Sequence, residues 1–226
     1  MIKVKNLTKI YKDNNNQNIV FENLNFEIKQ GEITIIRGQS GCGKSTLLNI
    51  LASIDNNANG EVIVDNQNIL TLNESQRADF RNKYMGFVFQ SHELIPEFNI
   101  LENITVPLLL RNESQSIAKN KAIALLKKLQ IPSTHFYKKP EQLSGGQQQR
   151  VAIARAIIHT PKIIFADEPT GNLDPKTRDE VIELIKDLKS DDRTIVIVTH
   201  DDVLEEIADT VFKFEYNNGN FEFKRK

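Results

Sequence analysis

The chain has 226 residues and nearly balanced charge, with 29 Lys and Arg against 30 Asp and Glu. This balance argues against the basic surface of a general nucleic-acid binder, so we expect no nucleic-acid partner. The single cysteine, Cys42, excludes an internal disulfide framework, and the first residues lack the apolar run of an export signal, which favours the cytoplasm. No stretch approaches the ~18–20 apolar residues of a spanning helix, so another chain would have to supply any membrane span.

Short apolar segments near the start of the chain predict β-strands at residues 2–6, 19–26 and 60–64. A polar tract at residues 13–18 separates the first two, and its run Asn14-Asn15-Asn16 is typical of a hairpin loop. We therefore expect an antiparallel β layer in this part of the chain.

Three apolar runs rich in β-branched residues, 33–36, 163–166 and 195–198, are typical of strands buried on both faces. The first is followed by a glycine-rich turn and a helical pattern. The second leads to Asp174 and Pro175, a good N-cap followed by proline at the first helical position. Alternation of strand, loop and helix predicts a parallel α/β sheet.

The pattern becomes helical between about residues 91 and 159, and apolar residues in 117–129 are spaced along one helix face. We predict a single domain over residues 1–226. Its core and β layer would comprise residues 1–90 and 160–226, and about 91–159 would form an inserted helical subdomain.

A phosphate-loop motif is complete in this sequence: Gly38-Gln39-Ser40-Gly41-Cys42-Gly43-Lys44-Ser45. It lies between a predicted strand and a predicted helix, as the motif requires. Glycines let backbone N–H groups surround an anion, and the following helix offers its positive end. Lys44 should reach the terminal phosphates and Ser45 should bind Mg²⁺, so the motif predicts a nucleotide site.

Two carboxylates, Asp167 and Glu168, end the apolar run 163–166 at the carboxyl edge of the predicted sheet, where the phosphate loop also opens. Successive strand residues point in opposite directions, so the two acids would have different roles. Asp167 is best placed to hold Mg²⁺ through water, and Glu168 to polarise the water that attacks the γ-phosphate. Without the phosphate loop, two solvated carboxylates would be the better interpretation.

A second anion-binding helix start is predicted at Leu143-Ser144-Gly145-Gly146-Gln147-Gln148-Gln149-Arg150, where a Ser-Gly-Gly turn leads into a helix beginning near Gln147. With this segment the chain resembles the ATPase subunits of ABC transporters. The resemblance implies a P-loop NTPase fold of the ABC type and ATP as the nucleotide. It also implies that Ser144, Gly145 and Gly146 complete the ATP site of an opposite protomer, so that two chains close head to tail over two ATP molecules.

Further positions match the same family in order, and the resemblance implies their roles. Tyr11 would stack on adenine, although a half-buried tyrosine of the β layer is the plainer interpretation. Gln90 would contact the Mg²⁺ and γ-phosphate region, and Thr46 would join the ATP-binding residues of the phosphate loop. His200 would bind the γ-phosphate and orient Glu168 with the attacking water.

Asp174 follows Gly171-Asn172-Leu173 and resembles part of the loop that joins the two ATP sites, although it also caps a helix. Cys42 lies near a helix start that would lower its pKa, so we expect alkylation of this thiol to inhibit ATP hydrolysis and ATP to protect it. The remaining histidines, His92, His135 and His159, match no site motif.

Residues 87–90, 94–97 and 166–174 resemble the branch that contains lipoprotein-releasing, macrolide-exporting, antimicrobial-peptide-resistance and cell-division ATPases. This implies an integral membrane permease as partner, a position on the cytoplasmic face of the membrane, and export or mechanical work on a peptide, drug or lipoprotein. A soluble ABC ATPase of DNA repair or translation is the alternative. An adaptor that binds ATP without turnover is a third interpretation, disfavoured by the intact Glu168 and His200. The basic residues 224–226 would form a solvated tail or meet lipid headgroups.

Overall fold

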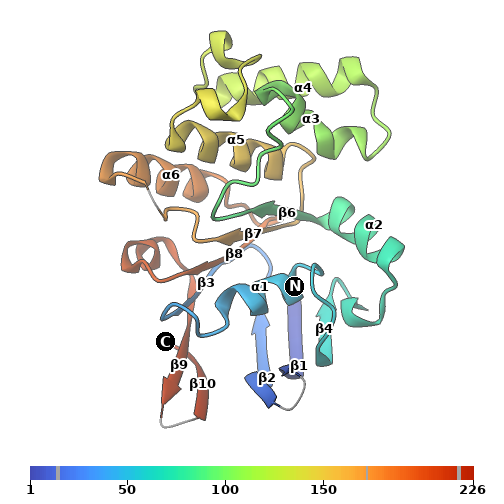
Figure 1. Ribbon diagram of the computed structural model, residues 1–226, viewed down its shortest axis with the longest axis vertical. Helices are drawn as coiled ribbons and strands as arrows, with labels where there is room; N and C mark the ends of the chain where they lie inside the picture. Colours follow the sequence, from blue (N-terminus) through green and yellow to red (C-terminus); the bar gives the residue numbers. More distant parts are fainter. Residues whose placement is uncertain (14–15, 172, 218–219) are drawn as a thin grey trace. The chain divides into compact units, whose positions relative to one another are not determined.

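The computed structural model describes residues 1–226 except 14, 15, 172, 218 and 219. The described residues form two compact units, one of Met1–Arg81 with Lys189–Lys226 and the other of Asn82–Leu188. The second unit includes the predicted helical segment 91–159 and extends beyond it at both ends. The elements of each unit are labelled in Figure 1.

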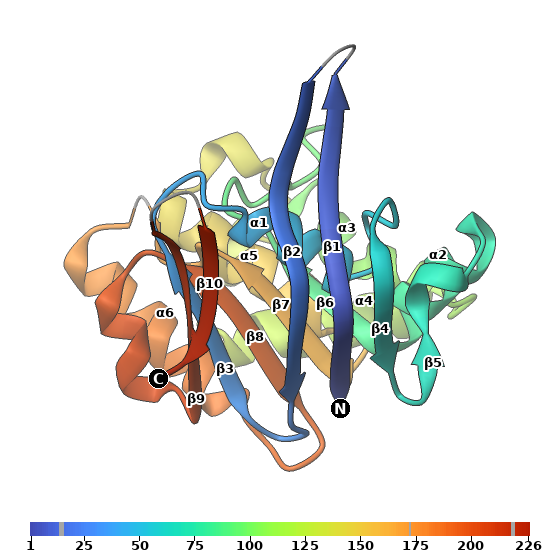
Figure 2. The same ribbon diagram turned by 90° about the horizontal axis from the view of Figure 1, so that it is seen from below.

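An antiparallel β layer, as expected, lies in the first unit. Its strands run in the order β2 (Asn16–Ile28), β1 (Ile2–Asp13), β4 (Asn59–Val64) and β5 (Gln67–Asn68), as Figure 2 shows. Strands β1 and β2 are much longer than predicted, because they pair with each other through polar residues that carry no strand pattern of their own. Residues 14 and 15 of the predicted hairpin loop lie outside the described part of the chain.

Parallel strands form the second sheet of this unit. Strand β3 (Ile33–Gly38) lies between β8 (Thr194–Thr199) and β9 (Thr210–Asn217) and is parallel to both. Every residue of β8 is buried, as its apolar run predicted. Helix α1 (Lys44–Leu51) follows β3, and the short 3-10 helix η4 (Asp202–Ile207) follows β8.

Residues 224–226 are exposed to solvent, as predicted, but they do not form a free tail. Strand β10 (Asn220–Arg225) pairs antiparallel with β9, and the N–H of Lys226 donates to the carbonyl of Val211 at 2.8 Å. The Lys226 ammonium also lies 2.6 Å from a carboxylate oxygen of Glu205. Strand pairing thus orders a segment whose charge alone suggested solvent.

Short helices follow β5: η1 (Ile69–Thr71) and then α2 (Glu74–Tyr84). Helix α2 was not predicted from the sequence. Phe80 is its only buried residue, so the helix lacks the apolar stripe that reveals a packed helix.

In the second unit, strand β6 (Met85–Val88) pairs in parallel with β7 (Ile163–Asp167). Its helices are α3 (Ile100–Leu109), α4 (Gln115–Lys128), α5 (Gly145–Ile157) and α6 (Pro175–Asp187), with short 3-10 helices η2 (Ser133–His135) and η3 (Pro140–Gln142) before α5.

Helices α3, α4 and α5 share one hydrophobic core, to which Ile104, Leu126 and Ala154 each contribute a fully buried side chain. The predicted apolar face of α4 is buried at Ala118 and Leu126, but Ile117 is 51% exposed and lies outside the core. Helix packing therefore confirms most of that face. The α/β class with a mixed sheet, an antiparallel layer and a helical segment is confirmed.

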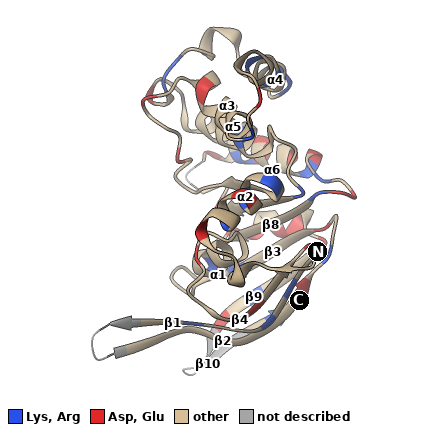
Figure 3. Ribbon diagram, turned by 90° about the vertical axis from the view of Figure 1, so that its right-hand side faces the viewer, with Lys and Arg blue, Asp and Glu red and all other residues tan. Residues whose placement is uncertain are grey.

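Basic and acidic residues are both scattered over the described chain, as Figure 3 shows. The apolar helix α3 is only 10 residues long and contains Pro107. Among the described residues, no helix has the length and apolar character needed to cross a bilayer.

Candidate nucleotide-binding site

The phosphate loop connects β3 to α1 in the first unit. An added Cβ at Gly38 would lie 2.5 Å from the carbonyl oxygen of Phe214, so only glycine fits at the end of β3. Gly43 is the N-cap residue of α1, with a φ of +99°, and it makes no side-chain capping hydrogen bond. The first N–H groups of α1 therefore remain available for an anion.

Lys44 folds back over this loop. Its Nζ donates to the carbonyl oxygens of Gly38 at 2.8 Å and Gln39 at 2.9 Å, and the residue is only 6% exposed. An ammonium has three N–H donors, so one remains for a phosphate oxygen. Ser45 is exposed in the first turn of α1, and Thr46 beside it is half-buried.

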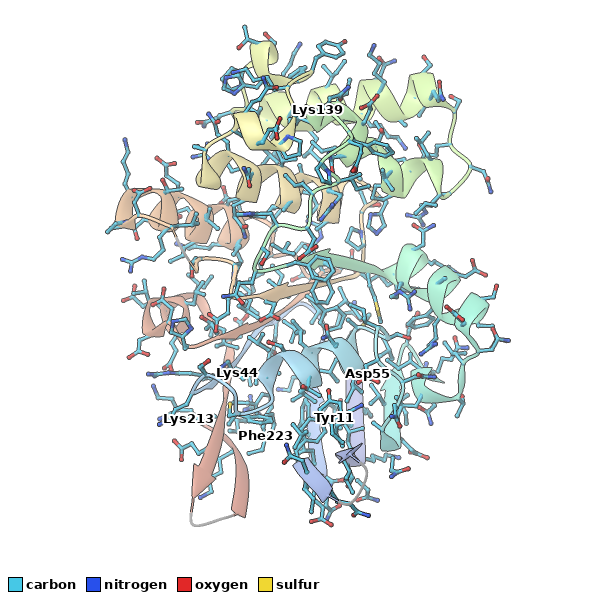
Figure 4. All side chains as sticks on the ribbon, viewed as in Figure 1. Tyr11, Lys44, Asp55, Lys139, Lys213 and Phe223 are labelled. Atoms are coloured by element: carbon cyan, nitrogen blue, oxygen red, sulfur yellow. The ribbon has the colours of Figure 1, made fainter. Side chains whose placement is uncertain are left out.

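A cavity of about 790 Å³ opens over the phosphate loop, a size that suits a nucleotide. Its lining comes from β2, the end of β3, the loop, the segment after β8, and β9, so it lies entirely within the first unit. The lining residues are Asn18, Ile19, Val20, Arg37, Gly38, Gln39, Ser40, Gly41, Cys42, His200, Lys213, Phe214 and Glu215. Figure 4 labels Lys44 of the phosphate loop and Lys213, which lines the cavity from β9. The Lys213 side chain joins the loop N–H groups in making the cavity suitable for an anion, whereas Arg37 is paired with carboxylates.

His200 lies in the turn after β8, exposed and facing this cavity. The N–H of Asp201 donates to Thr199 Oγ1 at 3.0 Å, and Asp201 Oδ1 accepts the N–H of Val203 at 3.0 Å. These hydrogen bonds fix the turn, so the position of His200 is defined by the backbone on both sides.

An ion network that the sequence did not reveal lies next to this turn. Arg37, at the end of β3, pairs with Asp202 and with Glu205, the latter at 2.7 Å. Hydrogen bonds from Lys226 and then from Arg37 lower the pKa of Glu205, so its carboxylate stays charged. The network joins the strand before the phosphate loop to the helix after His200.

Tyr11 lies on β1 of the same unit and is 47% exposed. The ammonium of the buried Lys9 lies over its ring, 4.7 Å from the centroid. The structure thus leaves Tyr11 with accessible aromatic surface, as a base-stacking residue requires.

In the second unit, Asp167 ends β7 and Glu168 follows it directly. Asp167 is half-buried, whereas Glu168 is 8% exposed and has a φ of +44°, which is unusual for a residue with a long side chain. The N–H of Gly171 donates to the carbonyl oxygen of Glu168 at 3.0 Å and closes a tight turn. Backbone strain of this kind clusters at functional sites, because the surrounding structure must maintain it.

Two glutamines contact or approach this turn. An added Cβ at Gly171 would lie 3.5 Å from Glu168 Cβ and 3.8 Å from Gln90 Nε2, so Gln90 and Glu168 approach the same glycine. Gln149 of α5 is 2% exposed and donates through Nε2 to the carbonyl oxygen of Pro169 at 2.7 Å. Sequence reasoning missed Gln149, because its partner lies in a different motif.

Helix α5 begins at Gly145, two residues before the predicted start near Gln147. Ser144 is its N-cap: Ser144 Oγ accepts the N–H of Gln147 at 3.4 Å, and the Gln147 side chain accepts the N–H of Ser144 at 3.2 Å. An added Cβ at Gly145 would meet nothing within 4 Å, whereas one at Gly146 would lie 2.2 Å from Thr177 Cγ2. Ser144 and Gly145 are therefore exposed at the helix start, and Gly146 packs against α6.

Asp174 caps α6, as the Asp-Pro pair predicted. Its carboxylate accepts the N–H of Thr177 at 3.1 Å and the Thr177 hydroxyl at 2.5 Å, and these hydrogen bonds lower the pKa of Asp174. The neighbouring Asn172 of the predicted loop lies outside the described residues. The capping role is structural and leaves Asp174 fully exposed.

Burial shifts the pKa of two further side chains, the half-buried Cys42 and the buried His159. Burial raises the pKa of the Cys42 thiol and outweighs the charge of Lys44 and the backbone N–H groups, so the expected lowering is wrong. His159 is 6% exposed, its Nε2 lies 3.0 Å from the carbonyl oxygen of Met85, and burial lowers its pKa. The part of the chain that the structure describes holds no cluster of three or more His, Cys, Asp or Glu suited to a metal.

The sequence profile of the ABC transporter family matches residues 21–171, more than half of the chain. The chain belongs to the ABC transporter family. It is an ATP-binding subunit and an ATPase, and the expected ABC ATPase fold is confirmed.

Relatives within this family are similar over nearly their whole length. An uncharacterised ABC transporter ATP-binding protein of Methanocaldococcus jannaschii, MJ1508, is 45% identical and aligns over 94% of this chain and 95% of its own. The lipoprotein-releasing system ATP-binding protein LolD of Pseudoalteromonas translucida is 42% identical over 96% and 92%. These relatives do not support the alternative of a DNA-repair or translation ATPase.

A solved ABC structure aligns with the entire chain. It is described as a dimeric post-hydrolysis state of the ATP-binding cassette MJ0796 bound to ADP and phosphate. Its TM-score is 0.91 at 39% identity, and the alignment covers 100% of this chain and 98% of that one.

Proposed function

We propose that this chain works as a head-to-tail homodimer that closes over two ATP molecules and drives an integral membrane permease from the cytoplasmic face of the membrane. The observation that carries the proposal is the pair of anion-binding helix starts in one chain. Helix α1 begins behind a complete phosphate loop, and α5 begins behind the exposed Ser144 and Gly145. One nucleotide needs one phosphate loop, so the second start serves the nucleotide of another protomer.

In the first unit, the N–H groups of residues 38–46 bind the phosphates, and Lys44 donates to the terminal ones. Tyr11 stacks on adenine through its exposed ring surface. His200 donates to the γ-phosphate from the wall of the cavity. The hydrogen bonds around Asp201 support this role because they hold the turn in place.

In the second unit, Glu168 accepts a proton from the attacking water as the water oxygen bonds to the γ-phosphorus and ADP leaves. The turn from Glu168 to Gly171 holds this carboxylate. Asp167 and Gln90 of this unit offer a carboxylate and an amide oxygen, and Ser45 of the first unit offers a hydroxyl. Mg²⁺ prefers oxygen ligands of these kinds, so the residues fit that ion. When bound, Mg²⁺ neutralises charge on the phosphates.

Ser144, Gly145 and Gly146 act on the nucleotide of the opposite protomer, and Asp174 joins the two sites. The Ser144 oxygen already caps its own helix, but its hydroxyl hydrogen remains free to donate to a phosphate. The dimeric MJ0796 structure, similar over the whole chain, supports this assembly.

The cargo class follows from the relatives. Several of them are LolD proteins of lipoprotein-releasing systems, so we propose a peptide, drug or lipoprotein as the molecule exported or moved mechanically. The membrane chain that copurifies tests this: a permease with few spans and a large outer domain supports it, and an importer with a binding protein contradicts it.

Complementation between two inactive variants tests the shared site. Lys44→Ala disables the phosphate loop, and Gly145→Asp places a negative charge at the exposed start of α5. The aspartate should not disturb folding, because a Cβ there meets nothing within 4 Å and acids suit a helix N-terminus.

Each variant alone should lack ATPase activity. A mixed dimer, however, contains one intact site, made from the phosphate loop of one chain and the α5 start of the other. Random mixing should therefore restore about a quarter of wild-type activity. If each chain used its own α5 start, mixing would restore nothing and the head-to-tail dimer would be wrong.

A further inference from the structure

Lys9 on β1 is almost completely buried, with 1% of its surface exposed. Lysine reaches such burial only when its ammonium is paired. Its Nζ lies 2.7 Å from Asp55 Oδ2 and 2.7 Å from the carbonyl oxygen of Asn57. Both partners belong to the segment after α1, 46 and 48 residues away in the sequence.

The same ammonium lies over the ring of Tyr11, 4.7 Å from its centroid. Alternate residues of a strand share a face, so Lys9 places its charge under the side chain two residues further along β1. Tyr11 itself remains 47% exposed. One part of the ring therefore contacts a fixed, desolvated cation, and the rest is accessible.

Asp55 is held by the end of the helix that begins with Lys44. The N–H groups of Ile54 and Asp55 both donate to the carbonyl oxygen of Asn49 in α1, at 2.8 and 3.1 Å. Asp55 Oδ1 also accepts the N–H of Asn57 at 2.8 Å. Lys9 thus connects the strand that carries Tyr11 to the helix that follows the phosphate loop, and Figure 4 labels Tyr11, Asp55 and Lys44.

We propose that Lys9 is a positioning residue for the nucleotide base, holding the Tyr11 ring in the orientation that stacks on adenine. This inference rests on the proposed role of Tyr11. A half-exposed tyrosine at the end of a strand can adopt several rotamers, and binding must select one. A cation that is paired, buried and fixed against the ring restricts that choice before the nucleotide arrives.

Two ligands that are not hydrolysed by this site separate base recognition from phosphate recognition. ADP engages the base site and the phosphate loop, whereas inorganic pyrophosphate engages the phosphate loop alone. Lys9→Met keeps the length of the side chain and removes its charge. We expect Lys9→Met to weaken ADP binding about three- to tenfold and leave pyrophosphate binding unchanged, both measured calorimetrically with Mg²⁺.

As a control, Lys9→Met is also made in a protein that already carries Tyr11→Ala. Because Lys9 acts through the ring, Lys9→Met should cause no further loss of ADP affinity once Tyr11 is alanine. Equal weakening of ADP and pyrophosphate, or an undiminished effect of Lys9→Met in the Tyr11→Ala protein, would show a general structural role and overturn the inference.

Asp55→Asn covers the case in which Lys9→Met does not fold. The amide oxygen still accepts a hydrogen bond from Lys9 but attracts it less, so a selective loss of ADP affinity of about two- to threefold is expected. If Asp55→Asn weakens both ligands equally, the inference fails.

The two proposals fail in different ways. If Tyr11→Ala leaves ADP affinity unchanged, the stacking role of Tyr11 is wrong and the role of Lys9 falls with it. If Tyr11→Ala weakens ADP binding and neither Lys9→Met nor Asp55→Asn does, only the positioning role is wrong.

Discussion

Burial changes the acid–base chemistry of individual side chains in ways that sequence position does not indicate. Cys42 lies next to a helix start and two residues before Lys44, and both features favour a thiolate. Its half-buried position in the folded loop has the larger effect and raises the pKa. His159 matched no motif, yet its burial lowers its pKa, although the Met85 carbonyl next to it favours the protonated form.

We predict that Cys42 is alkylated slowly near neutral pH. The thiolate is the reactive form, so a raised pKa moves the rise in rate to higher pH than for a free thiol. Iodoacetamide rates between about pH 6.5 and 10, with glutathione as reference, measure this. Bound ATP should slow the reaction. A neutral-pH rate above that of glutathione would contradict the prediction, and inhibition that persists in Cys42→Ser would exclude Cys42 as its cause.

His159 should make the protein less stable in acid. Its folded pKa lies below the ordinary value of about 6.5, so the unfolded chain binds the proton more readily. The stability that the neutral, buried His159 contributes is complete above pH 6.5. It is lost as the pH falls from 6.5 toward the pKa of His159 in the folded protein. Urea unfolding at pH 7.5 and 5.5 should show a larger loss for wild type than for His159→Gln, whose amide can still donate to Met85. Equal losses would contradict the prediction.

At the scale of elements, α5 connects the predicted site segments of the second unit. Its N-terminus carries Ser144 and Gly145, and Gln149 in its second turn holds the turn after Glu168. Arg155, near its end, donates to the carbonyl oxygens of His92 at 2.8 Å and Glu93 at 2.5 Å, in the segment after Gln90. A shift of α5 would therefore move both segments.

Gly86→Ala should disrupt the contact between β6 and α5. A Cβ at Gly86 would lie 2.1 Å from the carbonyl oxygen of Ala156, so strand or helix must move. We expect a loss of about 2–4 kcal/mol in the free energy of unfolding, measured with urea. Gly145→Ala is the control, because its Cβ meets nothing and stability should not fall. Similar stabilities for Gly86→Ala and wild type would show that the contact can relax.

Local pattern predicted some elements well and others poorly. The strand, turn and helix around Lys44 were predicted because each follows from contiguous residues. Helix α2 was missed because it buries only Phe80, and β10 was missed because its order comes from pairing with β9. Strands β1 and β2 were predicted too short for the same reason, since cross-strand hydrogen bonds extend them through polar residues.

At the scale of the whole molecule, hydrolysis should control association. Glu168→Gln removes the carboxylate that we propose as the acceptor of the proton from water, and it preserves the shape of the side chain. The variant should bind ATP, fail to hydrolyse it and remain a dimer with ATP, whereas the wild type returns to monomers as ATP is consumed. Light scattering after size-exclusion chromatography measures this. A variant that stays monomeric with saturating ATP would contradict the shared-site proposal.

The sequence alone predicted that this chain is an ATPase, because its phosphate loop, acidic strand end and Ser-Gly-Gly turn are short contiguous motifs that can be recognised without the fold. Tertiary structure decided which side chains support them. The pairing of Lys9 with Asp55, the link from Gln149 to Pro169 and the pKa of Cys42 depend on residues that only folding brings together. Burial strengthens these contacts, fixes the side chains that make them and shifts the pKa values of nearby groups. A local sequence pattern predicts none of these effects.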